Sequence, residues 1–207
     1  MMLIELPYVR ERAVEYARTW ALERNPLFPN FAGIGGDCTN FVSQCVLAGC
    51  CLMNDTLDFG WYYFSPTDRA PAWTGVKYFY DFMTMAPEFV RENGGIGPYG
   101  REILLQDAEI GDVIQLADRQ GMYYHTLIIS GFSGGDPLVC AHTDDALDRP
   151  LSSYRYAQER VIHIMGARGD LDSLACYEGL LSGEVYRQPE IRTGDAILTR
   201  TREESNG

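Results

Sequence analysis

Residues 35–44 read Gly-Gly-Asp-Cys-Thr-Asn-Phe-Val-Ser-Gln, and this stretch decides the fold because it places a cysteine at the start of a buried helix. The two glycines favour a tight turn, and Gly36 or Asp37 is a suitable N-cap residue. After Cys38 the chain is apolar on most sides of a helix, which indicates a central buried helix that ends at Gly49.

Cys38 stands in the right place for a nucleophile. A helix N-terminus carries a partial positive charge and free N–H groups, which lower the pKa of a thiol and favour the thiolate. The same N–H groups can stabilise an oxyanion. Because Cys38 lies between Asp37 and the polar pair Thr39 and Asn40, a purely structural role is the weaker interpretation.

A nucleophilic cysteine needs a base, and the chain has 3 histidines. His125 begins an apolar strand and is the predicted base. His142 ends the next strand and is the preferred third residue that would orient His125. Asp144 is the competing carboxylate, and Asp37 is a further candidate for a catalytic or supporting role. His163 lies in an alternating strand and is interpreted as structural.

The rest of the chain predicts helices first and an antiparallel sheet afterwards, which is an α+β fold. Helical patterns cover residues 8–24 and 74–92, and a short helix is expected at 171–181. Strands are expected at 111–116, 123–130, 137–142, 161–165 and 194–202, and residues 94–98 are expected to form a loop. We therefore expect one domain over residues 1–168 and a C-terminal extension over 169–207.

Composition excludes several classes of partner. The formal net charge of −12 argues against nucleic acid, which requires clustered Lys and Arg. No segment has the run of ~20 apolar residues that a membrane helix needs, so no membrane insertion is expected. The absence of a signal peptide and the irregular spacing of the 6 cysteines favour a reducing, cytoplasmic compartment. Cys45, Cys50 and Cys51 are expected to be small buried hydrophobic residues.

The motif at residues 35–44 resembles the signature of the bacterial putative amidase-domain family, within the NlpC/P60- and CHAP-like group of papain-like cysteine hydrolases. Residues 8–21 resemble the first helix of that family, and residues 111–115, His125 and residues 142–144 resemble its sheet. The resemblance implies a papain-like fold with the nucleophile helix packed on an antiparallel sheet. It also implies an amidase or peptidase that works through a thioester, with roles carried over to Cys38, His125 and His142.

The resemblance further implies a peptide or amide substrate, with the stem peptide of bacterial peptidoglycan as a candidate, and no cofactor or metal. Aromatic residues in the middle of the chain either line a substrate groove or pack in the core: Trp61, Tyr62, Tyr63 and Trp73.

Three other functions remain open at this point. An acyltransferase would use the same thioester with an amine in place of water. A catalytically silent binding module would keep the fold without the reaction. A zinc site would combine Cys140 and His142 with Cys38 and His125.

Overall fold

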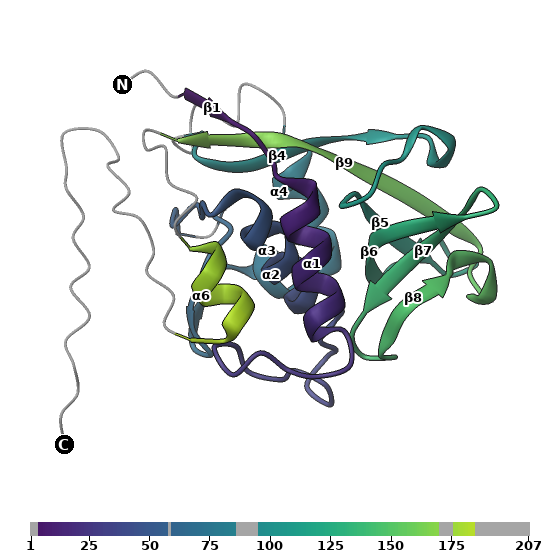
Figure 1. Ribbon diagram of the computed structural model, residues 1–207, viewed down its shortest axis with the longest axis horizontal. Helices are drawn as coiled ribbons and strands as arrows, with labels where there is room; N and C mark the ends of the chain where they lie inside the picture. Colours follow the sequence, from purple (N-terminus) through teal and green to yellow (C-terminus); the bar gives the residue numbers. More distant parts are fainter. Residues whose placement is uncertain (1–3, 58, 86–94, 170–175, 185–207) are drawn as a thin grey trace, which may run out of the picture.

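The computed structural model describes residues 4–57, 59–85, 95–169 and 176–184. Within these ranges the α+β class is confirmed. The helices lie on one side of the molecule and strands β5–β8 on the other, and the long strand β9 runs across both (Figure 1). The elements follow the chain as β1 (Ile4–Leu6), α1 (Arg10–Trp20), α2 (Cys38–Cys50), β2 (Tyr63–Ser65), β3 (Asp68–Arg69), α3 (Pro71–Thr74), α4 (Val76–Met83), β4 (Gly97–Ile103), β5 (Val113–Ala117), β6 (Tyr123–Ser133), β7 (Asp136–Ala141), β8 (Ala146–Pro150), β9 (Gln158–Gly169) and α6 (Tyr177–Ser182), with short 3₁₀ turns at Leu105–Asp107 and Leu151–Ser153.

The main sheet is antiparallel and curved. Its strands run in the order β1-β9-β5-β6-β7-β8, and β4 also pairs with β9. The four strands expected between residues 111 and 165 are present as β5, β6, β7 and β9. Strands β1, β4 and β8 were not expected, and β4 begins at Gly97, within the last two residues of the loop expected at 94–98.

Helix α2 is the centre of the fold. Every one of its 13 residues is buried, so the apolar pattern after Cys38 predicted its environment correctly. It ends one residue later than expected, because Cys51 rather than Gly49 adopts the left-handed C-cap conformation. The helix expected over residues 74–92 is present as α3 and α4, which are separated by Gly75, and α4 ends at Met83. Residues 86–92 of the expected helix lie outside the described residues.

The two faces of the sheet carry separate hydrophobic cores. The helix-facing core includes Val113, Ile128 and Ile162 together with α1, α2 and α4. The second core, on the opposite face, includes Ile114, Leu116 and Leu127. This alternation is the two-residue period of the strands, and it assigns a face to each polar residue of β5, β6 and β9.

A buried ionic cluster joins α1 to the sheet. Arg10 donates to Asp112 Oδ1 at 2.6 Å and to the carbonyl oxygen of Ile164 at 2.7 Å. His163 Nδ1 lies 2.9 Å from the other carboxylate oxygen of Asp112. Asp112 is fully buried, and these bonds offset the desolvation cost of its negative charge.

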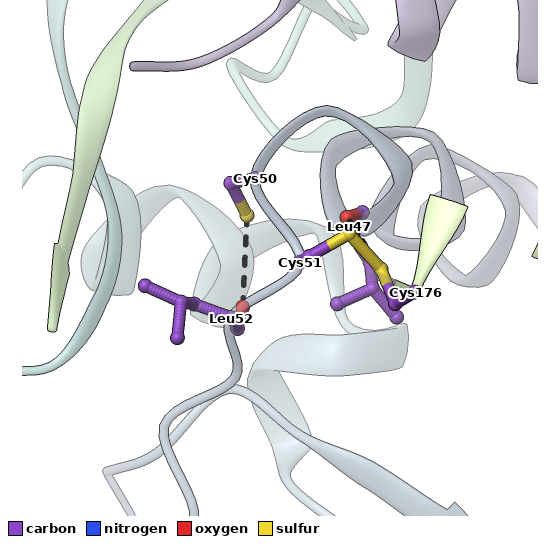
Figure 2. Close-up of a disulfide and its surroundings, with 5 residues drawn as sticks. All are labelled: Leu47, Cys50, Cys51, Leu52 and Cys176. Carbon is purple, nitrogen blue, oxygen red and sulfur yellow. Dashed lines mark hydrogen bonds between the residues drawn. A yellow bond between two sulfur atoms is a disulfide. The ribbon is translucent and has the colours of Figure 1, made fainter. Parts of the chain in front are cut away.

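A disulfide corrects one expectation about the cysteines. Cys51, at the C-cap of α2, is bonded to Cys176, the N-cap of α6 (Figure 2). The neighbouring Cys50 points away from this bridge and contacts the carbonyl oxygen of Leu52 (Figure 2). Cys51 is therefore not simply a buried hydrophobic residue. Because protein disulfides are typical of oxidising compartments, the cysteine pattern no longer favours a reducing one.

The bridge is one of several contacts between α6 and the rest of the fold. Asn25 donates to the carbonyl oxygen of Leu180 at 2.8 Å, and Trp20 Nε1 donates to that of Leu181 at 3.2 Å. The described part of the expected extension thus packs on α1 and α2. The strand expected at residues 194–202 lies outside the described residues.

None of the helices in the described ranges has the length and apolar character required to cross a membrane.

Candidate active site

Cys38 is the first residue of α2, and its thiol lies against the sheet. Its sulfur lies 3.9 Å from the hydroxyl oxygen of Thr39, the next residue of the helix. Thr39 links the helix to the sheet, because the hydroxyl groups of Thr39 and Thr126 lie 2.9 Å apart. The start of α2 is therefore docked on β6 at the residue that follows His125.

Burial controls the ionisation of Cys38. The side chain is almost fully buried, and this burial raises the pKa of the thiol above its ordinary value. Hydrogen bonds from the N–H of Thr126 and from Thr39 act in the opposite direction without overcoming the burial. The expectation of a lowered thiol pKa is therefore wrong for the unliganded site, which holds a neutral thiol.

His125 lies at the beginning of β6, as the sequence suggested. Its cross-strand partner is Leu116, so the register assigns it to the face of the second core. Burial lowers the pKa of His125 to about 4; the carboxylate of Asp144 raises it and the guanidinium of Arg149 lowers it further. The imidazole is therefore neutral near pH 7.

A buried nitrogen of His125 lacks a partner. Nε2 is inaccessible to solvent and has no hydrogen-bond partner among the described residues. Buried polar atoms are almost always paired, so this nitrogen requires an explanation, and a catalytic role is one that this rule allows. The described residues show no hydrogen bond between Cys38 Sγ and His125, so the two groups are separate in this state.

His142 does not contact His125 through a hydrogen bond in the described structure, because other groups occupy both of its nitrogens. Nδ1 lies 2.7 Å from Asp37 Oδ2, and Nε2 lies 2.8 Å from the carbonyl oxygen of Trp20. Its ring stacks on Phe41, one turn into α2, with centroids 3.9 Å apart. His142 thus holds Asp37, the residue that precedes Cys38, in place.

Asp37 contacts several groups at the start of α2. It is fully buried, and it also lies 3.2 Å from Arg24 Nε. Burial alone would raise the pKa of its carboxyl group, but hydrogen bonds from His142, from the N–H of Phe31 and from Asn40 outweigh burial and leave that pKa lowered. Asp37 is therefore a charged anchor at the helix start.

Asp144, the alternative third residue, lies near His125 and is mostly exposed. It pairs with Arg149, whose Nη1 lies 2.8 Å from Asp144 Oδ2. Arg149 in turn stacks on the ring of Tyr154, whose centroid is 6.0 Å from that of His125. The hydroxyl of Tyr154 is a second buried polar atom without a partner in this neighbourhood.

The aromatic residues considered for a groove lie in the core. Trp61 and Trp73 are fully buried with ring centroids 4.8 Å apart, and Tyr62 is also buried. Trp73 Nε1 donates to Asn40 Oδ1 at 2.9 Å, and Trp61 Nε1 donates to Ser43 Oγ at 3.1 Å. These rings support the polar residues of α2, so core packing is the interpretation that the structure selects.

Two polar residues beside the site were not identified from the sequence. Gln115 in β5 lies opposite Thr126, and its Nε2 is 3.4 Å from the hydroxyl of Thr126. Arg160 in β9 binds Gln115 Oε1. The sequence signal that could have identified them is Gln115 itself. The alternation of β5 assigns this glutamine to a buried face, where an amide without a hydrogen-bond partner would be costly.

The described residues contain no group of three metal-binding side chains. The zinc alternative that combined Cys38, His125, Cys140 and His142 therefore has no support from the geometry.

Comparisons with known proteins identify the family of this chain. Residues 7–165 match the family described as "Putative amidase domain", and the chain belongs to that family. The description of the family refers to the hydrolysis of amide bonds. The chain is also similar to a protein of Bacillus subtilis (strain 168) named "Uncharacterized protein YhbB", with 30% identity over 146 residues. The match covers 67% of this chain and 42% of that relative. No solved structure shows significant similarity to the chain.

Proposed function

We propose that the protein is a cysteine-dependent amidase or peptidase of papain-like fold, with Cys38 as nucleophile and His125 as base. The observation that carries the proposal is the buried, unpartnered Nε2 of His125. It belongs to the residue directly before Thr126, whose hydroxyl lies 2.9 Å from that of Thr39, the residue that follows Cys38. Catalytic hydrogen bonds are often long or poorly aligned in unliganded enzymes and tighten when substrate binds. The proposal therefore requires the side chain of His125 to move from the face of the second core toward Cys38.

The reaction begins from a neutral pair. The Cys38 sulfur attacks the carbonyl carbon of the amide while its proton passes to His125 Nε2. The oxyanion of the tetrahedral intermediate is stabilised by backbone N–H groups at the start of α2, which lack helical partners.

Collapse of this intermediate breaks the carbon–nitrogen bond, and the protonated His125 gives its proton to the leaving amine. Water then attacks the thioester, loses a proton to His125, and releases a carboxylic acid and the free thiol.

The residue that supports His125 is proposed to be Asp144 rather than His142. Asp144 is the carboxylate that stabilises the protonated form of His125, whereas both nitrogens of His142 have other partners. His142 and Asp37 instead hold the first turn of α2, and so act on Cys38 as positioning residues.

The test is to trap the thioester. The protein is incubated with short-chain p-nitrophenyl esters, and its intact mass is followed with and without hydroxylamine. We expect an acyl adduct on Cys38 that hydroxylamine removes, and its loss in Cys38→Ala. His125→Gln should form the adduct far more slowly, and Cys140→Ala, a matched change of another buried free thiol, should behave as wild type.

Two results would overturn the proposal. One is the absence of any adduct on Cys38; the other is an adduct that forms at the same rate in His125→Gln. Either result would favour the catalytically silent binding module. If the adduct forms, stem peptides of bacterial cell wall are the first amides to screen, and an added amine distinguishes hydrolysis from acyl transfer.

A further inference from the structure

Three polar side chains form a row across the helix-facing side of the sheet. Gln115 in β5 lies directly opposite Thr126 in β6 and opposite Arg160 in β9. Thr126 is the residue of this row that lies nearest to the proposed nucleophile, because its hydroxyl is 2.9 Å from that of Thr39, the residue after Cys38. Since neighbouring strands lie about 4.8 Å apart, Arg160 begins roughly 10 Å from Thr126.

The guanidinium of Arg160 is held in one orientation. Its Nε and Nη2 donate to Gln115 Oε1 at 2.8 and 2.5 Å. The guanidinium carbon lies 3.5 Å from the ring centroid of Tyr80 and 3.8 Å from that of Tyr123. Two rings at such distances occupy opposite faces of the planar group, so it cannot rotate freely.

Gln115 is fixed from its other end. Its Nε2 donates to the carbonyl oxygen of Val76, the first residue of α4, at 2.8 Å. The amide therefore cannot turn to release Arg160 without leaving buried polar groups unpaired. The position of Arg160 is set by the same sheet row that carries Thr126.

The Nη1 edge of the Arg160 guanidinium is available for hydrogen bonds to a ligand. No residue in the described ranges accepts a hydrogen bond from Nη1, and the side chain is half-buried rather than enclosed. Two carboxylates act on Arg160 electrostatically without accepting a hydrogen bond from it: Glu102, whose Oε2 accepts from the Tyr80 hydroxyl at 2.6 Å, and Asp81, which pairs with Lys77. A fixed guanidinium with an open edge is suited to bind a carboxylate.

We propose that Arg160 binds a carboxylate of the substrate, which makes the substrate class a peptide or acyl amide with a free carboxylate about 10 Å from the scissile bond. This inference rests on the proposed function of Cys38. A chain of net charge −12 repels anions at long range, so an anionic substrate requires a local cation of this kind. About three residues of extended peptide span that distance.

Binding can be measured without catalysis. In Cys38→Ala, acetyl-Ala-Ala-Ala is titrated as its free carboxylate and as its carboxamide, which differ only in that charge. The readout is the ¹⁵N chemical shift of the Arg160 Nε–H group. We expect the carboxylate to bind roughly 10- to 100-fold more tightly than the carboxamide, as a charged hydrogen-bonded pair implies.

Variants assign that preference to Arg160. In Arg160→Gln, affinity is read from backbone amide shifts, and the difference between the two peptides should vanish. Arg160→Lys keeps the charge, the Tyr contacts and the fold but loses the planar fork, and should show an intermediate preference. Arg119→Gln, a change of an exposed arginine in the turn after β5, is the matched control and should keep the full preference.

The proposal is overturned if both peptides bind equally, if neither binds at millimolar concentration, or if the preference survives in Arg160→Gln. These outcomes are separate from the thioester test. If the protein prefers the carboxylate peptide but forms no acyl adduct on Cys38, the proposed function is wrong and the anion site stands. If the adduct forms without the preference, the proposed function stands and the anion site is wrong.

Discussion

The carboxylate of Asp37 and the imidazole of His142 form a buried pair, 2.7 Å apart, at the N-terminus of the helix that begins with Cys38. The two residues are separated by 105 positions in the chain. Their contact joins the end of β7 to the start of α2, which explains how the first turn of that helix is held in place against the sheet.

Removal of the Asp37 charge should destabilise the fold. Breaking a buried pair leaves His142 and Arg24 without their shared partner, at a cost of about 3–5 kcal/mol. Asp37→Asn should therefore lower the free energy of unfolding in urea at pH 7 by that order. Asp145→Asn, which removes an exposed partner of the same Arg24, should change it by less than about 1 kcal/mol.

The Asp37 effect should depend on pH with a definite sign. The pKa of Asp37 is lowered in the folded protein, so its contribution is present above the pKa of the unfolded chain and is lost as pH falls through the folded value. The difference in unfolding free energy between wild type and Asp37→Asn should shrink on acidification. A constant difference from pH 7 down to the acid transition would contradict this account.

Alkylation of Cys38 by iodoacetamide should be slow near pH 7. Burial raises the pKa of the thiol above its ordinary value of 9.0, so the rate should rise with pH without a plateau below about pH 9. The rate should be the same in His125→Ala, because the imidazole is neutral in this state. Mass spectrometry of the modified peptide measures the rate, and a fast reaction at pH 6 that depends on His125 would show a preformed ion pair instead.

Asp144 and Arg149 should shift the titration of His125 in opposite directions. The carboxylate raises the pKa of His125, which is about 4, and the guanidinium lowers it. Asp144→Asn should therefore move the midpoint to lower pH, and Arg149→Gln should move it to higher pH. NMR titration of the His125 ring gives both midpoints, and shifts in the same direction would show that the pair acts through structure rather than charge.

Loss of the disulfide should destabilise the protein. The bond closes a loop between residues 125 positions apart, and removing such a bond typically costs about 2–5 kcal/mol. Cys176→Ser should lower the free energy of unfolding by this order, and reductant should destabilise wild type but not the variant. Cys50→Ser, at the neighbouring free thiol, should show the same response to reductant as wild type.

The sequence predicts the local part of this structure well. The period-two pattern of residues 111–165 predicts four sheet strands, and the turn before Cys38 predicts the start of α2. It does not predict β4, because seven residues that include two glycines show no clear alternation, and their strand forms only through pairing with β9.

The site is predictable only in part, for a related reason. Cys38 and His125 have local signals, namely a helix start and a strand start. The hydrogen-bond partner of His142 has no such local signal. No short stretch of sequence indicates that β7 ends beside Asp37 rather than beside His125. The raised pKa of Cys38 is also non-local, since it depends on how completely β6 covers the thiol.

The pairing of Cys51 with Cys176 also bears on the order in which the protein matures. The ribosome delivers Cys51 early, beside the free thiols of Cys45 and Cys50, and delivers Cys176 last. Until residue 176 arrives, any oxidation of Cys51 produces a non-native bond that must later be exchanged. Correct maturation therefore requires oxidation to follow synthesis, and a cell that makes this protein benefits from delaying the oxidant or supplying an isomerase.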